Sequence, residues 1–154
     1  MPSYKVYKLN KLFIEFFFII HIMARCEIPV SIGELWDKYT ILMIKNERIE
    51  TTEKLQLVKI EMDELRPFTE KYALPEELRK EMYDVNSQLW DLEDKIRLLD
   101  NRHIFDKTFI DTSRQIYATN DKRYEVKKKI NVYHKSNIME VKSYHEHNAP
   151  KHTK

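Results

Sequence analysis

The sequence has very little glycine, cysteine and proline. Its 154 residues include one glycine, one cysteine and five prolines. Tight β-hairpin turns and phosphate-binding loops depend on glycine, so both are almost excluded. A lone cysteine, Cys26, excludes an internal disulfide and a zinc site built from several cysteines, and it is typical of a reducing compartment. The composition therefore favours helices and a cytoplasmic protein.

The sequence also lacks an excess of charge of either sign. It has 27 basic and 25 acidic residues, a net charge of +2 with neutral histidines. Duplex-binding modules usually have a strongly basic surface, so we expect no nucleic-acid partner. A chain of this length is the size of one domain, which can bury a core without disulfides or a structural metal.

No apolar run is long enough for a stable membrane span. Residues 12–22 are mostly apolar and follow several lysines, but Glu15 and His21 interrupt them. The run is about half of the roughly 20 residues that a span needs, and no small-residue cleavage site follows. Residues 1–22 could be a membrane-associating segment, an integral part of the fold, or an extension that precedes the true start. We favour the last interpretation, with Met23 as the start.

Helix signals begin directly after this segment. Ser31 and Glu34 have the spacing of a capping box, which predicts the start of a first helix. Apolar residues lie on most sides of that helix, so we expect it to be central. Thr51 and Thr52 can cap a second helix, which Pro67 is expected to disturb or end.

The third expected helix has the clearest pattern. Pro75, followed by Glu76 and Glu77, forms a favourable first turn. Apolar residues and a final histidine then alternate at spacings of four and three, as in a heptad repeat: Leu78, Met82, Val85, Leu89, Leu92, Ile96, Leu99 and His103. Such a helix would be about 40 Å long and needs a long partner.

The fourth expected helix supplies that partner. Asp106 can cap it, and we expect it to end near Ser136 and Asn137. Its expected apolar side consists of Phe109, Ile110, Ile116, Tyr117, Tyr124 and Ile130. The prediction is an all-α bundle of about four helices with coiled-coil-like seams, the third and fourth forming a long antiparallel hairpin against the first two.

Beyond the predicted domain of residues 23–137, residues 138–154 form a basic tail. His145, His147 and His152 lie in it. We interpret the tail as flexible and solvated, and the alternatives are weak contact with an anionic surface or capture of a metal by the histidines.

Polar residues that interrupt the expected helix faces are the candidate functional residues. They are Glu34, Asp37 and Lys38 in the first helix, Trp90, Glu93 and Arg97 in the third, and Asn120, Asp121 and Arg123 in the fourth. Thr40, Asn86, Asp94 and Lys127 lie beside them on the same three helices.

Three interpretations of this cluster remain open. It could be structural, because Glu93 and Arg97 form an ordinary i,i+4 surface pair and Asn120 can set helix register. It could bind an anionic ligand through Lys38, Arg97 and Arg123, with acidic residues orienting them and tryptophans forming walls. A catalytic carboxylate or divalent-metal site is the third interpretation, but the paired Glu-x-x-Glu and Glu-x-x-Asp signature of helical nucleotide pyrophosphatases is not properly reproduced. We expect no metal, cofactor or nucleophilic catalysis.

Three stretches resemble the signature segments of a small protein family of unknown function. They are IPVSIGELWDKYTIL at residues 28–42, LWDLEDKIR at 89–97 and YATNDKR at 117–123. The resemblance extends from about residue 28 to residue 144, so the first 22 residues and the histidine-rich tail fall outside it. It implies a start close to the first motif, which agrees with Met23. Members are sometimes encoded beside, or fused to, glycosyltransferases, which implies a pathway rather than an activity, and the family supplies no catalytic residues.

From these observations we expect a non-catalytic interaction or accessory domain, linked by the resemblance to cell-surface glycan assembly. The alternative is a small enzyme or binding protein for an anionic ligand, such as a nucleotide sugar or sugar phosphate, held in a polar pocket between helices. The expected partners are another protein or a second copy of the chain, bound through helix seams.

Overall fold

The computed structural model describes residues 26–143. Within that part every regular element is a helix: α2 (Ile32–Arg48), α3 (Thr52–Lys71), α4 (Glu76–Asn101) and α5 (Lys107–Tyr133). The predicted all-α bundle of four helices is confirmed. The predictions for residues 1–22, for a start at Met23 and for the three tail histidines lie outside the described residues.

The predicted helix starts at Ser31 and Asp106 are confirmed by their hydrogen bonds. The Ser31 hydroxyl accepts from the backbone N–H of Glu34 at 3.2 Å. The Asp106 carboxylate accepts from the N–H groups of Thr108 and Phe109 at 2.8 and 3.2 Å. These side chains satisfy N–H groups that have no partner within the helix, which is why the helices begin there.

Three helices end at residues other than those the sequence suggested. Helix α3 continues through Pro67 to Lys71, because a proline in the last turns removes one hydrogen bond without preventing the final turn. Helix α4 ends at Asn101, and His103 adopts a φ of 55° in the following turn instead of extending the seam. Helix α5 ends at Tyr133, a few residues earlier than predicted.

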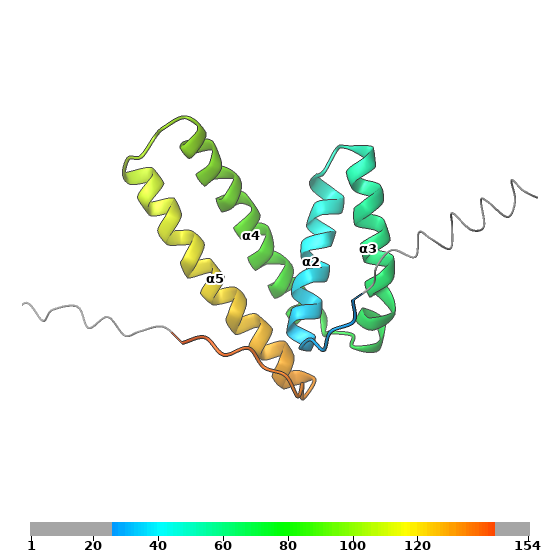
Figure 1. Ribbon diagram of the computed structural model, residues 1–154. Coiled ribbons are helices and arrows are strands. Elements are labelled where there is room, and N and C mark those ends of the chain that lie inside the picture. The colour runs from blue at the N-terminus through cyan, green and yellow to red at the C-terminus, as the bar shows by residue number, and fades with distance from the viewer. Residues whose placement is uncertain (1–25, 144–154) are drawn as a thin grey trace, which may run out of the picture.

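The helices form two hairpins that meet at one end and diverge at the other (Figure 1). Helices α2 and α3 form the first hairpin, and the longer α4 and α5 form the predicted antiparallel second one. Helix α2 contacts all three other helices, so its predicted central position is confirmed. Within the described part of the chain, α3 packs on α2 alone.

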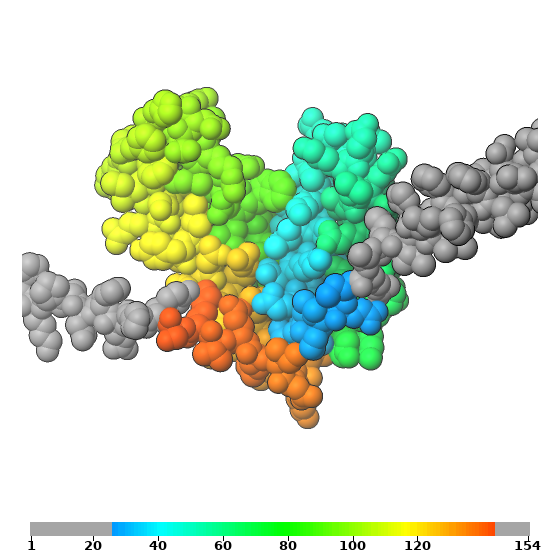
Figure 2. Space-filling view, in the orientation of Figure 1, coloured from blue at the N-terminus to red at the C-terminus, as the bar shows by residue number. Residues whose placement is uncertain are grey.

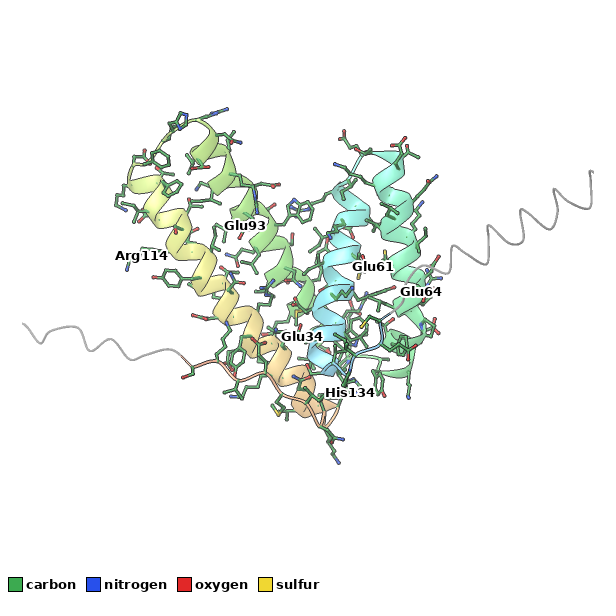
Figure 3. All side chains as sticks on the ribbon, viewed as in Figure 1. Glu34, Glu61, Glu64, Glu93, Arg114 and His134 are labelled. Atoms are coloured by element: carbon green, nitrogen blue, oxygen red, sulfur yellow. The ribbon has the colours of Figure 1, made fainter. Side chains whose placement is uncertain are left out.

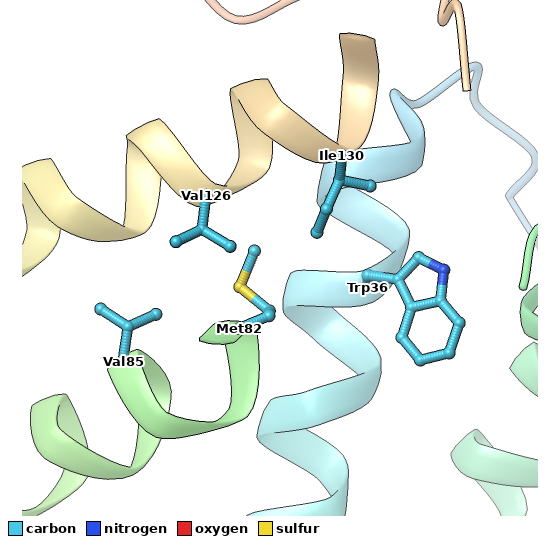
Figure 4. Packing of buried hydrophobic residues seen from close by; sticks show 5 residues of the cluster. All are labelled: Trp36, Met82, Val85, Val126 and Ile130. Carbon is cyan, nitrogen blue, oxygen red and sulfur yellow. The ribbon is translucent and has the colours of Figure 1, made fainter. Parts of the chain in front are cut away.

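The apolar core lies where the hairpins meet. It consists of Trp36, Met82, Val85, Val126 and Ile130, which come from α2, α4 and α5 (Figure 4). Met82 and Ile130 are completely buried. The Trp36 indole N–H donates to the backbone carbonyl of Tyr72 at 2.8 Å. Trp36 therefore belongs to the core and ties α2 to the connection between the hairpins.

The inward face of α5 differs from the predicted apolar side. Ile110 and Tyr117 are more than half exposed. The residues that face inward alternate at spacings of three and four: Phe109, Thr112, Ile116, Thr119, Arg123, Val126 and Ile130. The inward face of α5 therefore includes two threonines and an arginine, which a search for apolar residues does not reveal.

The only glycine of the sequence lies where α2 crosses α5. The Gly33 N–H donates to the Asn131 side-chain oxygen at 2.7 Å. A Cβ atom at Gly33 would lie 2.6 Å from the backbone oxygen of Lys127. Any larger residue would push the helices apart, so glycine sets the closed end of the two hairpins.

Candidate functional site

A cleft of about 340 Å³ lies between the diverging hairpins. The space-filling view shows the molecule hollowed between them (Figure 2). The cleft is lined by side chains of α2, α4 and α5: Ile41, Ile44, Asn86, Leu89, Trp90, Glu93, Asp94, Arg97 and Arg123. Its volume is within the range of about 300–1,000 Å³ that small-molecule pockets occupy.

Contacts of Arg48, at the end of α2, hold one side of the cleft. Its guanidinium group forms an ion pair with Asp91 and lies 6.0 Å from the centre of the Trp90 ring. A second contact between the same helices joins the Tyr83 hydroxyl to the Glu47 carboxylate. Both contacts join α2 to α4 beside the Trp90 ring, which forms one wall of the cleft.

Two arginines reach the cleft from opposite helices. The Arg97 guanidinium forms an ion pair with Glu93 at 2.9 Å and donates to the Glu93 backbone carbonyl at 2.8 Å. Arg123 donates instead to the side-chain oxygen of Asn120 at 2.7 Å. An amide oxygen is neutral, so this hydrogen bond supplies no counter-charge to the Arg123 guanidinium.

Behind the cleft lies a buried polar layer. The Asn86 amide donates to the Asp37 carboxylate and to the Thr40 hydroxyl, both at 2.9 Å. Its Oδ1 atom is buried and accepts no hydrogen bond within the described residues. Burial raises the pKa of the Asp37 carboxyl, opposed by the hydrogen bond from Asn86 and by the charges of Arg123 and Lys127.

A separate group of ion pairs lies at the closed end of the two hairpins, where α2 crosses α5. The Lys127 ammonium, which is buried, pairs with Glu34 at 2.6 Å and with Glu140 from the segment after α5. Burial opposes its charged form, but the two carboxylates outweigh that effect and raise its pKa. Glu34 lies low, near the junction of the hairpins, whereas Glu93 lies higher on α4 (Figure 3).

Among the candidate residues, the structure brings four together and separates the others. Trp90, Glu93, Arg97 and Arg123 line the cleft. Asp37 and Asn120 contact cleft residues from behind. Glu34, Lys38 and Asp121 point to other partners: Lys127, Glu61 at 2.7 Å and Lys142 at 3.1 Å.

The apolar part of the cleft is what sequence reasoning missed. Ile41 and Ile44 belong to the apolar sides predicted for the first helix and Leu89 to the heptad pattern of the third, but neither these residues nor Arg48 were assigned to a site. The apolar surface that surrounds α2 on most sides was the available signal, because one such side has to face something other than its neighbouring helices.

The segment that follows α5 returns along that helix. The Tyr124 hydroxyl donates to the Glu140 backbone carbonyl at 3.4 Å, and the Lys142 ammonium donates to the Asn120 carbonyl at 3.3 Å. Residues 138–143, which we assigned to the tail, therefore contact α5, and the rest of the tail lies outside the described residues.

The described residues include no group of three or more histidine, cysteine or acidic side chains placed to hold a metal ion. Glu61 of α3 forms an ion pair with Lys38 of α2. No described helix combines the length and the apolar character needed to cross a bilayer.

Comparison with known proteins places the chain in a family. No curated protein and no solved structure matches it. A family model does match, over residues 26–153, and its description is a family of unknown function, DUF6165. The match includes the C-terminal segment, so the expectation that the histidine-rich tail falls outside the family pattern was wrong. Because the match covers most of its length, the chain belongs to the family DUF6165.

Proposed function

We propose that this domain is a non-catalytic interaction or accessory domain that binds its partner in the cleft between the two hairpins. The observation that carries the proposal is the composition of the cleft. An apolar floor meets an indole ring, two guanidinium groups and a buried amide that has an unused acceptor. Binding sites usually combine apolar area with a few placed polar groups in this way.

The geometry supports binding better than catalysis. A catalytic site of the kind we considered would direct Glu34 and Asp37 into one pocket with Arg97 and Arg123. Instead, Glu34 pairs with Lys127 and Asp37 lies behind Asn86. Glu34 and Asp37 are therefore engaged outside the cleft, and Glu93, which lines the cleft together with Asp94, is paired with Arg97.

The second candidate function is binding of a small anionic ligand, such as a nucleotide sugar or sugar phosphate. The neutral partner of Arg123 favours it, because that guanidinium can form a charge-assisted hydrogen bond with a phosphate or carboxylate. A link to glycan assembly rests on the family resemblance alone. The single cysteine supports a reducing, cytoplasmic setting.

Thermal unfolding against two panels tests both functions. One panel contains acidic peptides with apolar side chains, and the other contains nucleotides, nucleotide sugars and sugar phosphates. A ligand at 100 times its Kd stabilises a protein by about 2.7 kcal/mol, which raises the melting temperature measurably. Stabilisation by peptides supports the interaction function, and stabilisation by small anions supports the second candidate.

The matched variants are Arg123→Ala in the cleft and Arg114→Ala outside it. Arg114 is an exposed arginine on the same helix, is labelled in Figure 3 and does not line the cleft. We expect the stabilisation to disappear in Arg123→Ala and to persist in Arg114→Ala. If neither panel stabilises the protein, or if both variants respond alike, the cleft is not the binding site.

A further inference from the structure

The charged side chains that line the cleft between the hairpins balance one another. Two are acidic and two are basic: Glu93, Asp94, Arg97 and Arg123. Arg48, beside the cleft, is itself paired with Asp91. A purely anionic ligand would therefore meet two carboxylates as well as two guanidinium groups. A lining of this kind is complementary to a ligand that carries charges of both signs.

Two of these four groups have no charged partner of their own. Arg97 and Glu93 are paired with each other at 2.9 Å. Arg123 forms its hydrogen bond with the neutral Asn120 amide, and Asp94 is exposed and forms no hydrogen bond or ion pair within residues 26–143. The cleft thus offers one basic group on α5 and one acidic group on α4 for contacts with a ligand.

The Asn86 side chain is an independent indication of the ligand's chemistry. Asn86 lines the cleft but is only 4% exposed. Its amide nitrogen donates to Asp37 and Thr40, whereas its Oδ1 atom accepts no hydrogen bond within the described residues. A buried acceptor without a donor costs free energy, and a carboxylate or a phosphate dianion cannot relieve that cost because it has no proton to donate. An amino group can.

Arg123 and Asn86 lie near each other at the inner part of the cleft. The Asn86 amide is 2.9 Å from the Asp37 carboxylate. The charge of Arg123 is close enough to the same carboxyl to oppose the rise in its pKa. A guanidinium donor and an unused amide acceptor therefore both lie within reach of this one carboxyl group, so the acidic and amino groups that they would bind have to be close together in the ligand.

We propose that the ligand is an amino acid with a large apolar side chain, either free or at the N-terminus of a peptide; this inference rests on the proposed binding function of the cleft. The ligand's acidic group pairs with Arg123, and its amino group donates to Asn86 Oδ1. The carboxylates of Glu93 and Asp94 favour the positive charge of the amino group. The apolar side chain packs on the apolar floor and the indole wall, which consist of Ile41, Ile44, Leu89 and Trp90.

Three compounds that share one apolar body test the proposal. They are L-phenylalanine, 3-phenylpropionate, which lacks the amino group, and phenethylamine, which lacks the carboxylate. Each is titrated into the full chain while the Trp90 indole signal is followed by heteronuclear NMR. L-Phenylalanine should bind about ten-fold or more tightly than either of the other two, because each of them lacks one charge-assisted hydrogen bond.

A pair of peptides distinguishes the two sources of the amino acid. One peptide begins with aspartate and phenylalanine and has a free N-terminus, so that it carries an amino group, a carboxylate and an apolar ring. The other has the same sequence with an acetylated N-terminus. Tighter binding of the free peptide than of L-phenylalanine indicates a protein partner, and the reverse order indicates a free amino acid. Acetylation should abolish the difference from a simple anion.

Variants of the lining assign the amino group to its site. Asn86→Leu should bring the Kd of L-phenylalanine to about that of 3-phenylpropionate. Asp94→Asn, at an exposed position that the fold does not need, should weaken L-phenylalanine about three-fold without weakening 3-phenylpropionate. Asp100→Asn, an exposed acid of α4 outside the cleft, should change neither Kd. A purely structural effect would change both Kd values alike.

The outcomes separate this inference from the proposed function. If L-phenylalanine and 3-phenylpropionate bind equally, or if the acidic peptides bind while L-phenylalanine and the free peptide do not, the amino-acid ligand is overturned and the cleft remains a binding site. If no compound shifts the Trp90 signal, both proposals are overturned.

Discussion

At the scale of single residues, Gly33 has the clearest consequence. An alanine in a helix is usually more stable than a glycine by about 1 kcal/mol. At this position, however, the added carbon would lie 2.6 Å from the Lys127 backbone oxygen and disturb the hydrogen bond to Asn131. We expect Gly33→Ala to lower the free energy of unfolding by about 1–3 kcal/mol, measured by denaturant unfolding.

Asn46→Ala is the control for that prediction, because Asn46 is exposed on the same helix. It should leave the free energy of unfolding unchanged or slightly raised. If Gly33→Ala also raises stability, the helices do not approach as closely as the structure shows.

The buried Asp37 carboxyl predicts a dependence on pH. Its pKa is raised above 3.8 in the folded protein, mainly by burial, so the folded state holds this proton at a higher pH than the unfolded state does. The ionised carboxylate therefore costs stability at neutral pH, and that cost disappears as the pH falls through the folded pKa toward 3.8. Asp37→Asn should be more stable than the wild type at neutral pH, and the difference should vanish in acid.

Thermal unfolding of both proteins across the acidic range measures this difference. Asp84→Asn serves as the control, because Asp84 is exposed and pairs with its helix neighbour Lys80 at 2.5 Å. It should show no gain at neutral pH. A loss of stability in Asp37→Asn at neutral pH would mean that attraction to Arg123 and Lys127 outweighs burial.

At the scale of elements, local signals predicted where helices begin but not how they are rotated. Ser31 and Asp106 form the expected caps because a cap depends only on neighbouring residues. The rotation of a helix depends on its partners, and the Asp37–Asn86 contact joins residues far apart in sequence. Only part of the polar cluster could therefore be assigned to one site.

The continuation of α3 beyond Pro67 gives a prediction for that helix. Proline has no N–H to donate to the carbonyl of Asp63, and its ring crowds the preceding turn. Pro67→Ala should restore this hydrogen bond and raise the free energy of unfolding by about 1–3 kcal/mol. Part of this gain is offset because the unfolded chain has more conformational entropy without the proline. Chemical denaturation checks it, and a lower midpoint would mean that stiffening of the unfolded chain dominates.

At the scale of the whole molecule, the residues on one helix face of the cleft could be predicted from the sequence, but the arrangement of the helices around the cleft could not. Trp90, Glu93 and Arg97 share one face of α4, which helical spacing predicts. Arg123 joins them because the 3,4 spacing of α5 places it inward, among residues that an apolar pattern does not reveal. Ile41 and Ile44 complete the cleft only because the hairpins diverge, and no local signal specifies that angle.

The two tryptophans allow the most direct test of the cleft as a binding site. The indole N–H of Trp36 is bonded to the Tyr72 carbonyl in the core, whereas Trp90 lines the cleft. We would record heteronuclear NMR signals of both indole groups while adding the acidic peptides and then the small anions. If the cleft binds, the Trp90 signal shifts and saturates with one class of compound while the Trp36 signal stays in place. If Trp90 responds to neither class, or if both signals move together, the hairpins do not form the proposed site.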